Sequence, residues 1–491
     1  MKSRFLLTAG FALSMLFAAC SDDSASANPI DAGKDDGKVA GTTPSDSVTH
    51  KKSSVDTEDG ATFETKGSGY SENGFGGYSE DYLVYESVAA FDSYDGGVKM
   101  AGAVDESYRV TETPSVAPTP DVVTTVDEYI PGDYDVAPGG GDDGYNGRTH
   151  GLLTASEWND LDNWKAWTEI MYGEFASKAS YWDFSPRTLA AVQVVDEKGD
   201  GIANVSVKLL RGNDEVFATK TDNKGLAYCW VNLFDGDIEE VFKDEDYSLE
   251  INGKVSETPV KLSALADDSL NVNVITSDAK QADAKADIAF IVDATGSMGD
   301  EIRFLQSDLK YIIDHAYSDT KVALRTAVEF YRDQSDIYIV RGKDFSTNIE
   351  NTQAFIDEQM ANGGGDYPEA VHTALETSLQ NFSWNESARA RIAFLILDAP
   401  AHHQDDVIES LQNSITLYAK NGIKLIPVAA SGVDKDTESM LRFFEIITGG
   451  TYVFLTDDSG IGYSHIEASV GDHEVEKLAD LMIRLIKKYV E

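Results

Sequence analysis

Three short, almost wholly apolar runs in the C-terminal part of this sequence constrain its fold more than any other feature. They are Ile288–Val292, Ile392–Leu397 and Ile423–Val428. Uninterrupted apolar runs of this length are typical of strands buried on both faces of a parallel sheet, whereas a strand with one solvated face alternates apolar and polar residues. We therefore predict that the three runs are central strands of a parallel sheet.

Amphipathic helical patterns lie between and beyond these runs. After the first run, Ile302, Leu305, Leu309 and Ile312 recur at spacings of three and four, which places them on one face of a helix. The same spacing occurs after residue 370 and at the C-terminus. Alternation of strand and helix predicts a doubly wound, mainly parallel α/β fold, whose ligand crevice lies at the carboxyl ends of the strands.

Oxygen-bearing side chains follow two of the predicted strands at that edge. Asp293, Thr295 and Ser297 come after the first run, and Asp398 comes directly after the second. Hard divalent cations such as Mg²⁺ take carboxylate and hydroxyl oxygens and retain several waters, so a few such side chains on separate loops suffice. The sequence therefore predicts a cation site, with Mg²⁺ as the first choice and Ca²⁺ or Mn²⁺ as alternatives.

Residues 284–491 resemble a von Willebrand factor A domain with a metal-ion-dependent adhesion site. The family motif is D-x-S/T-x-S, then a residue from a second loop and an aspartate from a third. Asp293, Thr295 and Ser297 match the first element, and Asp398 matches the third. The resemblance implies a Rossmann-like fold and metal-dependent binding, in which an oxygen from a partner fills an open coordination position.

The second loop departs from the family pattern. Where the family usually has threonine, this chain has Asp366 in a G-G-G-D-x-P-E sequence that resembles a bacterial and extracellular-matrix branch. If Asp366 approaches the metal, a third carboxylate disfavours a carboxylate ligand, favours a carbonyl or sugar hydroxyl, and shifts the metal preference towards Ca²⁺. We expect Asp366→Thr to change ligand preference or metal choice.

The same residues have a purely structural interpretation. Asp293 and Asp398 would then be strand-terminal caps, Ser297 a helix N-cap, and Asp366 the start of the next helix. The three-part match at the strand ends favours the metal interpretation. His402 and His403 either line the metal face and contact a ligand, or simply precede a helix.

No catalytic set accompanies these residues. An aspartyl nucleophile at Asp293 would need acidic and cationic partners that we cannot place, and the run Gly363–Gly365 lacks the G-K-S/T context of a nucleotide loop. We therefore expect a binding protein and not an enzyme, with a metal-dependent hydrolase as a less favoured alternative.

The N-terminus has the pattern of a secretory signal over residues 1–19. Lys2 and Arg4 precede the apolar stretch Phe5–Phe17, which is too short to favour a transmembrane helix. The residues around Cys20 resemble a bacterial lipobox, which implies lipidation of Cys20 and a membrane anchor at the outer membrane or cell surface. Cleavage by signal peptidase I instead would remove Cys20 or leave it as an odd thiol.

Composition divides the rest of the chain into three segments. Residues 20–148 are rich in Ser, Gly, Asp and Glu, which predicts a disordered acidic tether. Residues 149–185 predict a helical linker, because Thr154–Glu157 matches a capping box and aromatic residues follow at helical spacing. Residues 186–278 alternate with period two, which predicts a small all-β sandwich, and they resemble carboxypeptidase-regulatory-like modules.

The net charge of −45 over 491 residues opposes nucleic-acid binding, because phosphate would be repelled. We therefore expect an exported, lipid-anchored surface protein that binds a protein or glycan partner through the metal face, in adhesion or complex assembly. The alternative is an accessory subunit of a secreted or envelope enzyme system.

Overall fold

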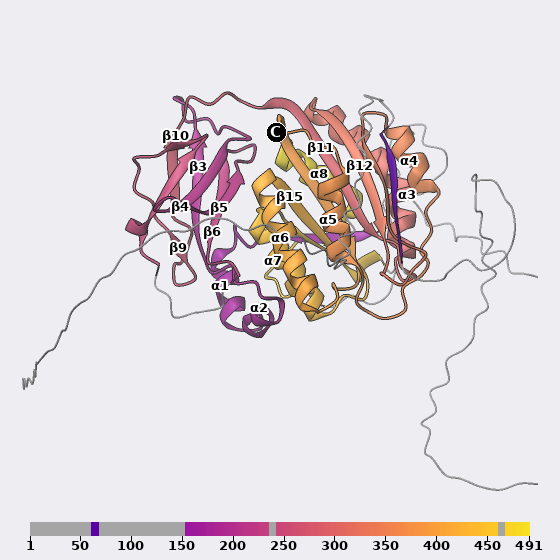
Figure 1. Ribbon diagram of the computed structural model, residues 1–491. Helices are drawn as coiled ribbons and strands as arrows, with labels where there is room; N and C mark the ends of the chain where they lie inside the picture. The colour runs from indigo at the N-terminus through magenta and orange to yellow at the C-terminus, as the bar shows by residue number, and fades with distance from the viewer. Residues whose placement is uncertain (1–59, 68–152, 235–241, 460–466) are drawn as a thin grey trace, which may run out of the picture. The chain divides into compact units, whose positions relative to one another are not determined.

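The computed structural model describes residues 60–67, 153–234, 242–459 and 467–491 (Figure 1). The predicted signal peptide, Cys20 and most of the predicted tether lie outside these residues. None of the helices in the described ranges is long and apolar enough to cross a bilayer.

A nine-stranded sheet forms the centre of the C-terminal region, in the order β1-β13-β12-β11-β14-β15-β16-β2-β17. Its strands are β1 (Thr62–Lys66), β2 (Thr154–Trp158), β11 (Asp283–Asp293), β12 (Ala323–Tyr331), β13 (Tyr338–Ser346), β14 (Ala388–Leu397), β15 (Ile423–Ala429), β16 (Tyr452–Leu455) and β17 (Glu476–Lys477). The central strands β12, β11, β14, β15 and β16 are parallel, and the outer strands pair antiparallel. The predicted mainly parallel α/β fold is therefore confirmed, and the three apolar runs lie in β11, β14 and β15.

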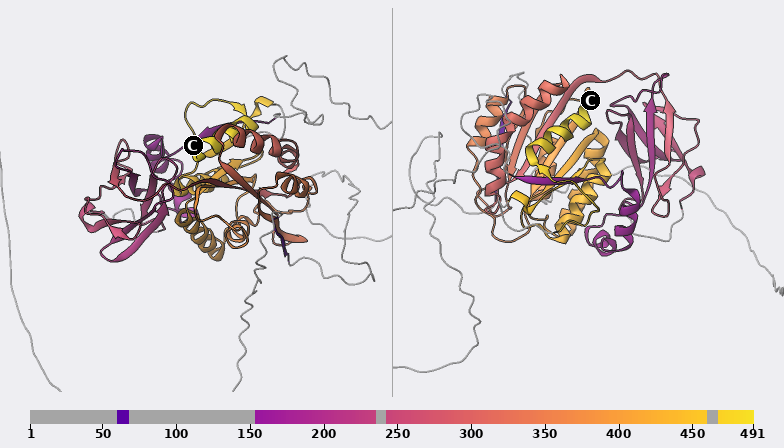
Figure 2. Two further views of the ribbon diagram at one scale, coloured as in Figure 1. Left: turned by 90° about the horizontal axis from the view of Figure 1, so that it is seen from above. Right: turned by 180° about the vertical axis from the view of Figure 1, so that it is seen from behind.

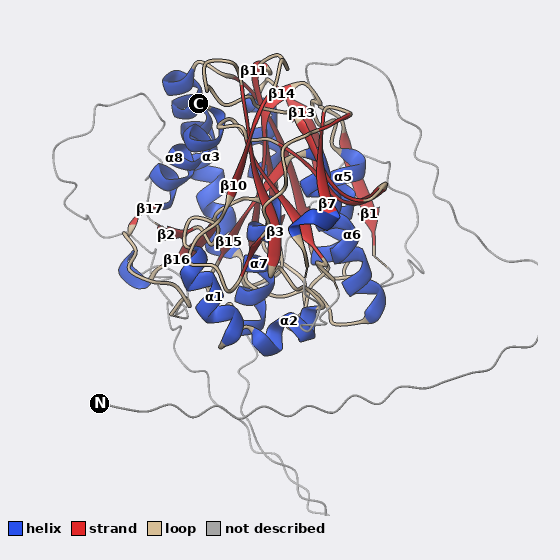
Figure 3. Ribbon diagram, turned by 90° about the vertical axis from the view of Figure 1, so that its left-hand side faces the viewer, coloured by secondary structure: helices blue, strands red, loops and turns tan. Residues whose placement is uncertain are grey.

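Helices cover both faces of this sheet (Figures 2 and 3). They are α3 (Gly299–Thr320), α4 (Ile349–Asp357), α5 (Val371–Asn381), α6 (Asp405–Asn421), α7 (Lys435–Thr448) and α8 (Leu478–Val490), with a 3₁₀ turn at η2 (Asp457–Ser459). Alternate residues of β11 enter two separate cores. Ile288 and Phe290 pack in the core that includes α3 and α8, while Ala289 and Ile291 pack in the core that includes α5, α6 and α7. Burial on both faces explains why the strand sequence is uninterrupted and apolar.

Two four-stranded sheets precede this region. The strands are β3 (Thr188–Val195), β4 (Ser206–Arg211), β5 (Asp214–Lys220), β6 (Leu226–Val231), β7 (Tyr247–Ile251), β8 (Lys254–Val255), β9 (Ser263–Ala264) and β10 (Val272–Thr276), with η1 at Asp244–Asp246. One sheet has the order β10-β3-β6, with β9 paired to β3, and the other has the order β5-β4-β7-β8. Val192, Leu209, Cys229 and Leu249 are fully buried in one apolar core. Cys229 is therefore a core residue, and burial raises the pKa of its thiol.

The prediction that the linker starts as a helix at Thr154 is wrong. Residues 154–158 form β2, which pairs with β16 and β17. Ala155 and Ser156 are fully buried, so the backbone there completes the large sheet and does not start a helix. The helices begin later, at α1 (Trp164–Tyr172) and α2 (Ala176–Trp182), and Trp164, Trp167 and Met171 form the buried side of α1.

The prediction of a disordered tether is also wrong at one place. Residues 62–66 form β1, which pairs antiparallel with β13 at the edge of the large sheet. The sequence TFETK combines β-branched and aromatic residues with two charged ones, and exposed and half-buried positions alternate along it, which suits an edge strand. The rest of the predicted tether lies outside the described residues.

Candidate cation site

The sheet order places two predicted ligands at neighbouring strand ends. Along the chain, the strands after β11 are added first on one side and then, from β14 onward, on the other. Asp293 is the last residue of β11, and Asp398 directly follows β14. Val292 and Ile396 are register partners, so both acids emerge at the carboxyl edge of the same strand pair. This is the switch point where doubly wound sheets bind ligands.

Asp293 is fully buried, and only one of its two carboxylate oxygens accepts hydrogen bonds. Its Oδ1 atom accepts hydrogen bonds from the Thr295 backbone N–H at 2.8 Å and the Thr295 hydroxyl at 2.7 Å. Its Oδ2 atom has no hydrogen-bond partner. Burial, with a smaller contribution from Asp398, raises the pKa of Asp293 to about 7. A buried carboxylate in this state lacks a counter-charge.

Asp398 is buried beside it, with 6% of its surface exposed. Burial raises the pKa of Asp398, and a hydrogen bond with the Ser297 side chain opposes that rise. Ser297 itself is exposed. Thr295 and Ser297 are the hydroxyl residues of the loop that follows β11, which we call the first loop. The Thr295 hydroxyl is therefore bonded to Asp293, and the Ser297 hydroxyl to Asp398.

Asp366 is exposed, and in the part of the chain that the structure describes it forms no hydrogen bond or ion pair with Asp293 or Asp398. The acid that the same loop buries is Glu369, which is 3% exposed and whose Oε2 atom has no partner. Burial raises the pKa of Glu369 to about 10, and Asp293 is the largest of the neighbouring charges that add to the rise. Glu369 was not among the predicted ligands, although it is the other carboxylate of the G-G-G-D-x-P-E loop.

Close packing holds the Glu369 loop against the first loop. Gly364 has φ +75°, and a Cβ atom there would lie 2.9 Å from Glu369 Oε1 and 3.3 Å from Thr295 Cβ. The Asn362 N–H donates to the Ala294 carbonyl at 3.0 Å. Glycine at position 364 therefore permits both the left-handed backbone and the close approach of the two loops.

A second missed acid is Glu301, in the first turn of α3. It is 3% exposed, and burial raises its pKa to about 7, while a hydrogen bond from the Ser431 backbone opposes the rise. Asp398 adds to the rise. The signal in the sequence was weak, because Glu301 directly precedes the apolar stripe that begins at Ile302.

The two histidines differ in their surroundings. His402 Nε2 lies 2.6 Å from Asp333 Oδ1. Burial alone would raise the pKa of Asp333, but the contact with His402 brings it below its ordinary value. His403 instead stacks on Tyr181 of α2, with ring centroids 3.8 Å apart, and its Nε2 lies 2.6 Å from the Tyr181 carbonyl. His402 is thus linked to an acid whose charge acts on Glu369, whereas His403 contacts α2.

The donor set fits a hard divalent cation. In the described ranges, no group of three or more His, Cys, Asp and Glu side chains is close enough to hold a metal alone. A cation here would therefore rely on two carboxylates, hydroxyl oxygens and water, which suits Mg²⁺. The buried and unpartnered Oδ2 atom of Asp293 is the specific feature that such an ion would satisfy.

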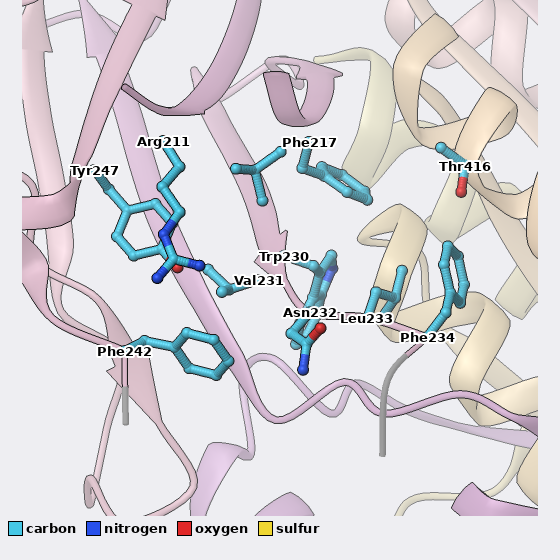
Figure 4. Close-up of a pocket in the computed structure, with 11 residues that line it drawn as sticks. Arg211, Phe217, Trp230, Val231, Asn232, Leu233, Phe234, Phe242, Tyr247 and Thr416 are labelled. Atoms are coloured by element: carbon cyan, nitrogen blue, oxygen red, sulfur yellow. The ribbon is translucent and has the colours of Figure 1, made fainter. Parts of the chain in front are cut away.

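A separate hollow of about 450 Å³ lies where β4 to β7 meet α6 (Figure 4). Arg211, Tyr247 and Phe242 lie on one side of it, and Phe234 and Thr416 lie on the other. The Arg211 guanidinium is 5.8 Å from the centre of the Tyr247 ring. None of the predicted metal ligands lines this hollow.

Comparison with known proteins identifies the C-terminal region. Residues 287–433 match the family described as von Willebrand factor A domain, so the chain contains such a domain. An ariadne-like RING finger protein of Acanthamoeba polyphaga mimivirus is 30% identical over 189 residues, which is 35% of this chain and 18% of that protein. Alpha-protein kinase vwkA of Dictyostelium discoideum is 26% identical over 190 residues, which is 35% of this chain and 29% of that protein. The chain therefore spans less than a third of either relative.

One solved structure, the conserved hypothetical protein BatB from Bacteroides thetaiotaomicron, matches with a TM-score of 0.28 and 12% identity. The match covers 42% of this chain and 98% of BatB.

Proposed function

We propose that the von Willebrand factor A domain of this chain is a cation-dependent binding domain. The observation that carries the proposal is the fully buried Asp293, whose Oδ2 atom is unpartnered and whose pKa is raised to about 7 beside a second buried acid, Asp398. A divalent cation would neutralise both carboxylates and offer an open coordination position to an oxygen of a partner. Mg²⁺ is the proposed ion, with Ca²⁺ or Mn²⁺ as alternatives.

Each side chain has a proposed role. Asp293 and Asp398 supply charge directly or through water, and Thr295 and Ser297 supply neutral oxygens. Because the Thr295 hydroxyl donates its proton to Asp293, the lone pairs of the Thr295 hydroxyl oxygen stay available to an ion. Glu369, a buried acid of the second loop, is proposed to reach the ion through water, because no group of three acids in the described ranges is close enough to bind it directly. Asp366, which is exposed, is proposed to face the partner, where it would select against carboxylate ligands.

We further propose that the partner is a protein or a glycan and that the domain works outside the cytoplasm. The signal-like residues 1–19 and the lipobox-like sequence ending at Cys20 support export and a lipid anchor at the outer membrane or cell surface. Adhesion or assembly of a surface complex follows from anchoring a binding domain there.

Calorimetric titration tests the cation site. Mg²⁺, Ca²⁺ and Mn²⁺ would be titrated into the full chain carrying Cys20→Ser, after EDTA treatment, beside the same chain with Asp293→Ala. The control is Asp405→Ala, which removes an exposed acid from the first turn of α6. Saturable binding that is lost in the Asp293 variant and kept in the control is expected. A parent chain that binds none of the three ions would overturn the proposal.

A further inference from the structure

Strand β1, the indigo strand in Figure 1, lies at the edge of the large sheet beside β13. Five residues pair with β13, with Phe63 opposite Gly342 and Glu64 opposite Arg341. A Cβ atom on Gly342 would lie 2.5 Å from Phe63 Cζ, so the missing side chain makes room for the ring. Phe63 also packs edge-on against Phe382, with ring centroids 5.8 Å apart. Its neighbours on β1 are exposed or half-buried, so Phe63 is the main apolar anchor of the strand.

One line of contacts runs from the end of β1 to the Glu369 loop. The backbone of Gly67 packs closely on Asp336, because a Cβ atom there would lie 2.0 Å from the Asp336 carbonyl oxygen. The Asp336 carboxylate accepts a hydrogen bond from the Gly364 N–H at 2.9 Å. Gly364 in turn packs on Thr295 and Glu369. Each step is a direct contact, so displacing Gly67 removes support from the loop that carries Glu369.

A second line of contacts reaches the first loop. Glu64 pairs with Arg341 at 3.0 Å, and the Arg341 guanidinium lies over the Tyr338 ring at 3.7 Å. Arg332 lies over the same ring at 4.4 Å and donates to the carbonyl of Ala294 at 3.2 Å. Ala294 is the residue after Asp293. The first line of contacts therefore ends on the Glu369 loop, and the second ends on the first loop of the candidate cation site.

We propose that β1 regulates the candidate cation site: docking of β1 on β13 holds the Glu369 loop and the first loop in place, and release of β1 weakens cation binding. The inference rests on the proposed function. Because coupling between two sites is reciprocal, cation binding also strengthens the docking of β1.

The test compares docked and released β1 in the full chain carrying Cys20→Ser. Phe63→Ala removes the anchoring ring, and Thr62→Ala, at an exposed position of the same strand, is the matched control. A disulfide between Thr62→Cys and Lys343→Cys, which are register partners within disulfide reach, then locks the strand in the Phe63→Ala background. Cys229 is buried and does not compete.

Two readouts separate the coupling from the cation site itself. In cation-free protein, hydrogen exchange of the Gly364 amide should become faster in Phe63→Ala and return to the parent rate when the disulfide forms. The Kd for the bound cation should weaken about fivefold or more, the lower end of typical coupling, with recovery in the locked chain. Unchanged Gly364 exchange and unchanged Kd after release of β1 would overturn the coupling. A parent chain that binds no cation would instead overturn the proposed function, whatever the exchange data show.

Discussion

Replacing Asp293 with asparagine should stabilise the cation-free protein at alkaline pH, although it destroys the proposed site. The carboxyl group is fully buried, and its pKa lies at about 7 instead of the ordinary 3.8. At 1.36 kcal/mol per pKa unit, the ionised form costs the fold about 4 kcal/mol. Asparagine keeps an oxygen for the two bonds from Thr295 but leaves amide N–H groups without partners, which costs about 1–3 kcal/mol. The expected net gain at pH 8 is about 1–3 kcal/mol.

The sign of this effect depends on pH. Below 3.8, Asp293 is neutral in both states, so its burial carries no charge penalty. As the pH rises towards 7, the unfolded chain loses the proton while the folded chain retains it, and the parent protein loses stability. Asparagine does not titrate. The difference between variant and parent should therefore change from unfavourable near pH 4 to favourable at pH 8.

The assay is urea unfolding in EDTA at pH 4, 6 and 8, on full chains that both carry Cys20→Ser. Asp405→Asn, at an exposed position, should show no comparable trend. Adding the preferred cation at pH 8 should stabilise the parent but not the Asp293→Asn chain. A difference in free energy of unfolding that does not vary with pH, or a variant that is less stable at pH 8, would refute the reasoning.

Three further outcomes are expected. Glu369→Gln should weaken cation binding in calorimetry more than Asp366→Asn does, because of these two acids only Glu369 is buried beside Asp293. A larger loss of affinity in Asp366→Asn would instead assign the second-loop role to Asp366. Cys20→Ser should move the protein from the membrane fraction to the soluble fraction of its host, and continued retention would rule out the lipid anchor. A fragment of residues 284–491 should unfold at a lower urea concentration than residues 153–491, and equal midpoints would show that β2 contributes nothing.

The parallel core was predictable because its physics is local. A strand buried on both faces is apolar at almost every position, and the run Ile288–Val292 shows this pattern without knowledge of its neighbours. Asp293 and Asp398 could be placed at one edge for a related reason, since parallel strands all point their carboxyl ends the same way. That their two strands are neighbours depends on the order of the strands in the sheet. The order of the strands along the chain does not reveal this.

The outer strands were not predictable because their partners are far away in sequence. Thr154–Glu157 match a helix-start pattern, but the backbone of β2 pairs with β16 and β17, which lie 294 to 323 residues later, and that pairing overrides the local preference. Glu369 and Glu301 were missed for a similar reason. Their burial depends on loops that pack together only after the sheet has formed, so composition and spacing carry little sign of it.

The position of β2 changes the interpretation of the segment before the von Willebrand factor A domain. After β1 and β2, which both belong to the large sheet, the chain forms α1, α2 and the two smaller sheets, and only then returns to the large sheet as β11. Asp160, just after β2, is fully buried and forms an ion pair with the buried Arg442 of α7, and its N–H donates to Glu445 at 3.0 Å. Removing one partner of such a pair costs about 3–5 kcal/mol, because the other charge stays buried and uncompensated. The smaller sheets are thus inserted in the chain between β2 and β11 of the large sheet, and a description of residues 149–185 as a separate helical linker does not account for Asp160.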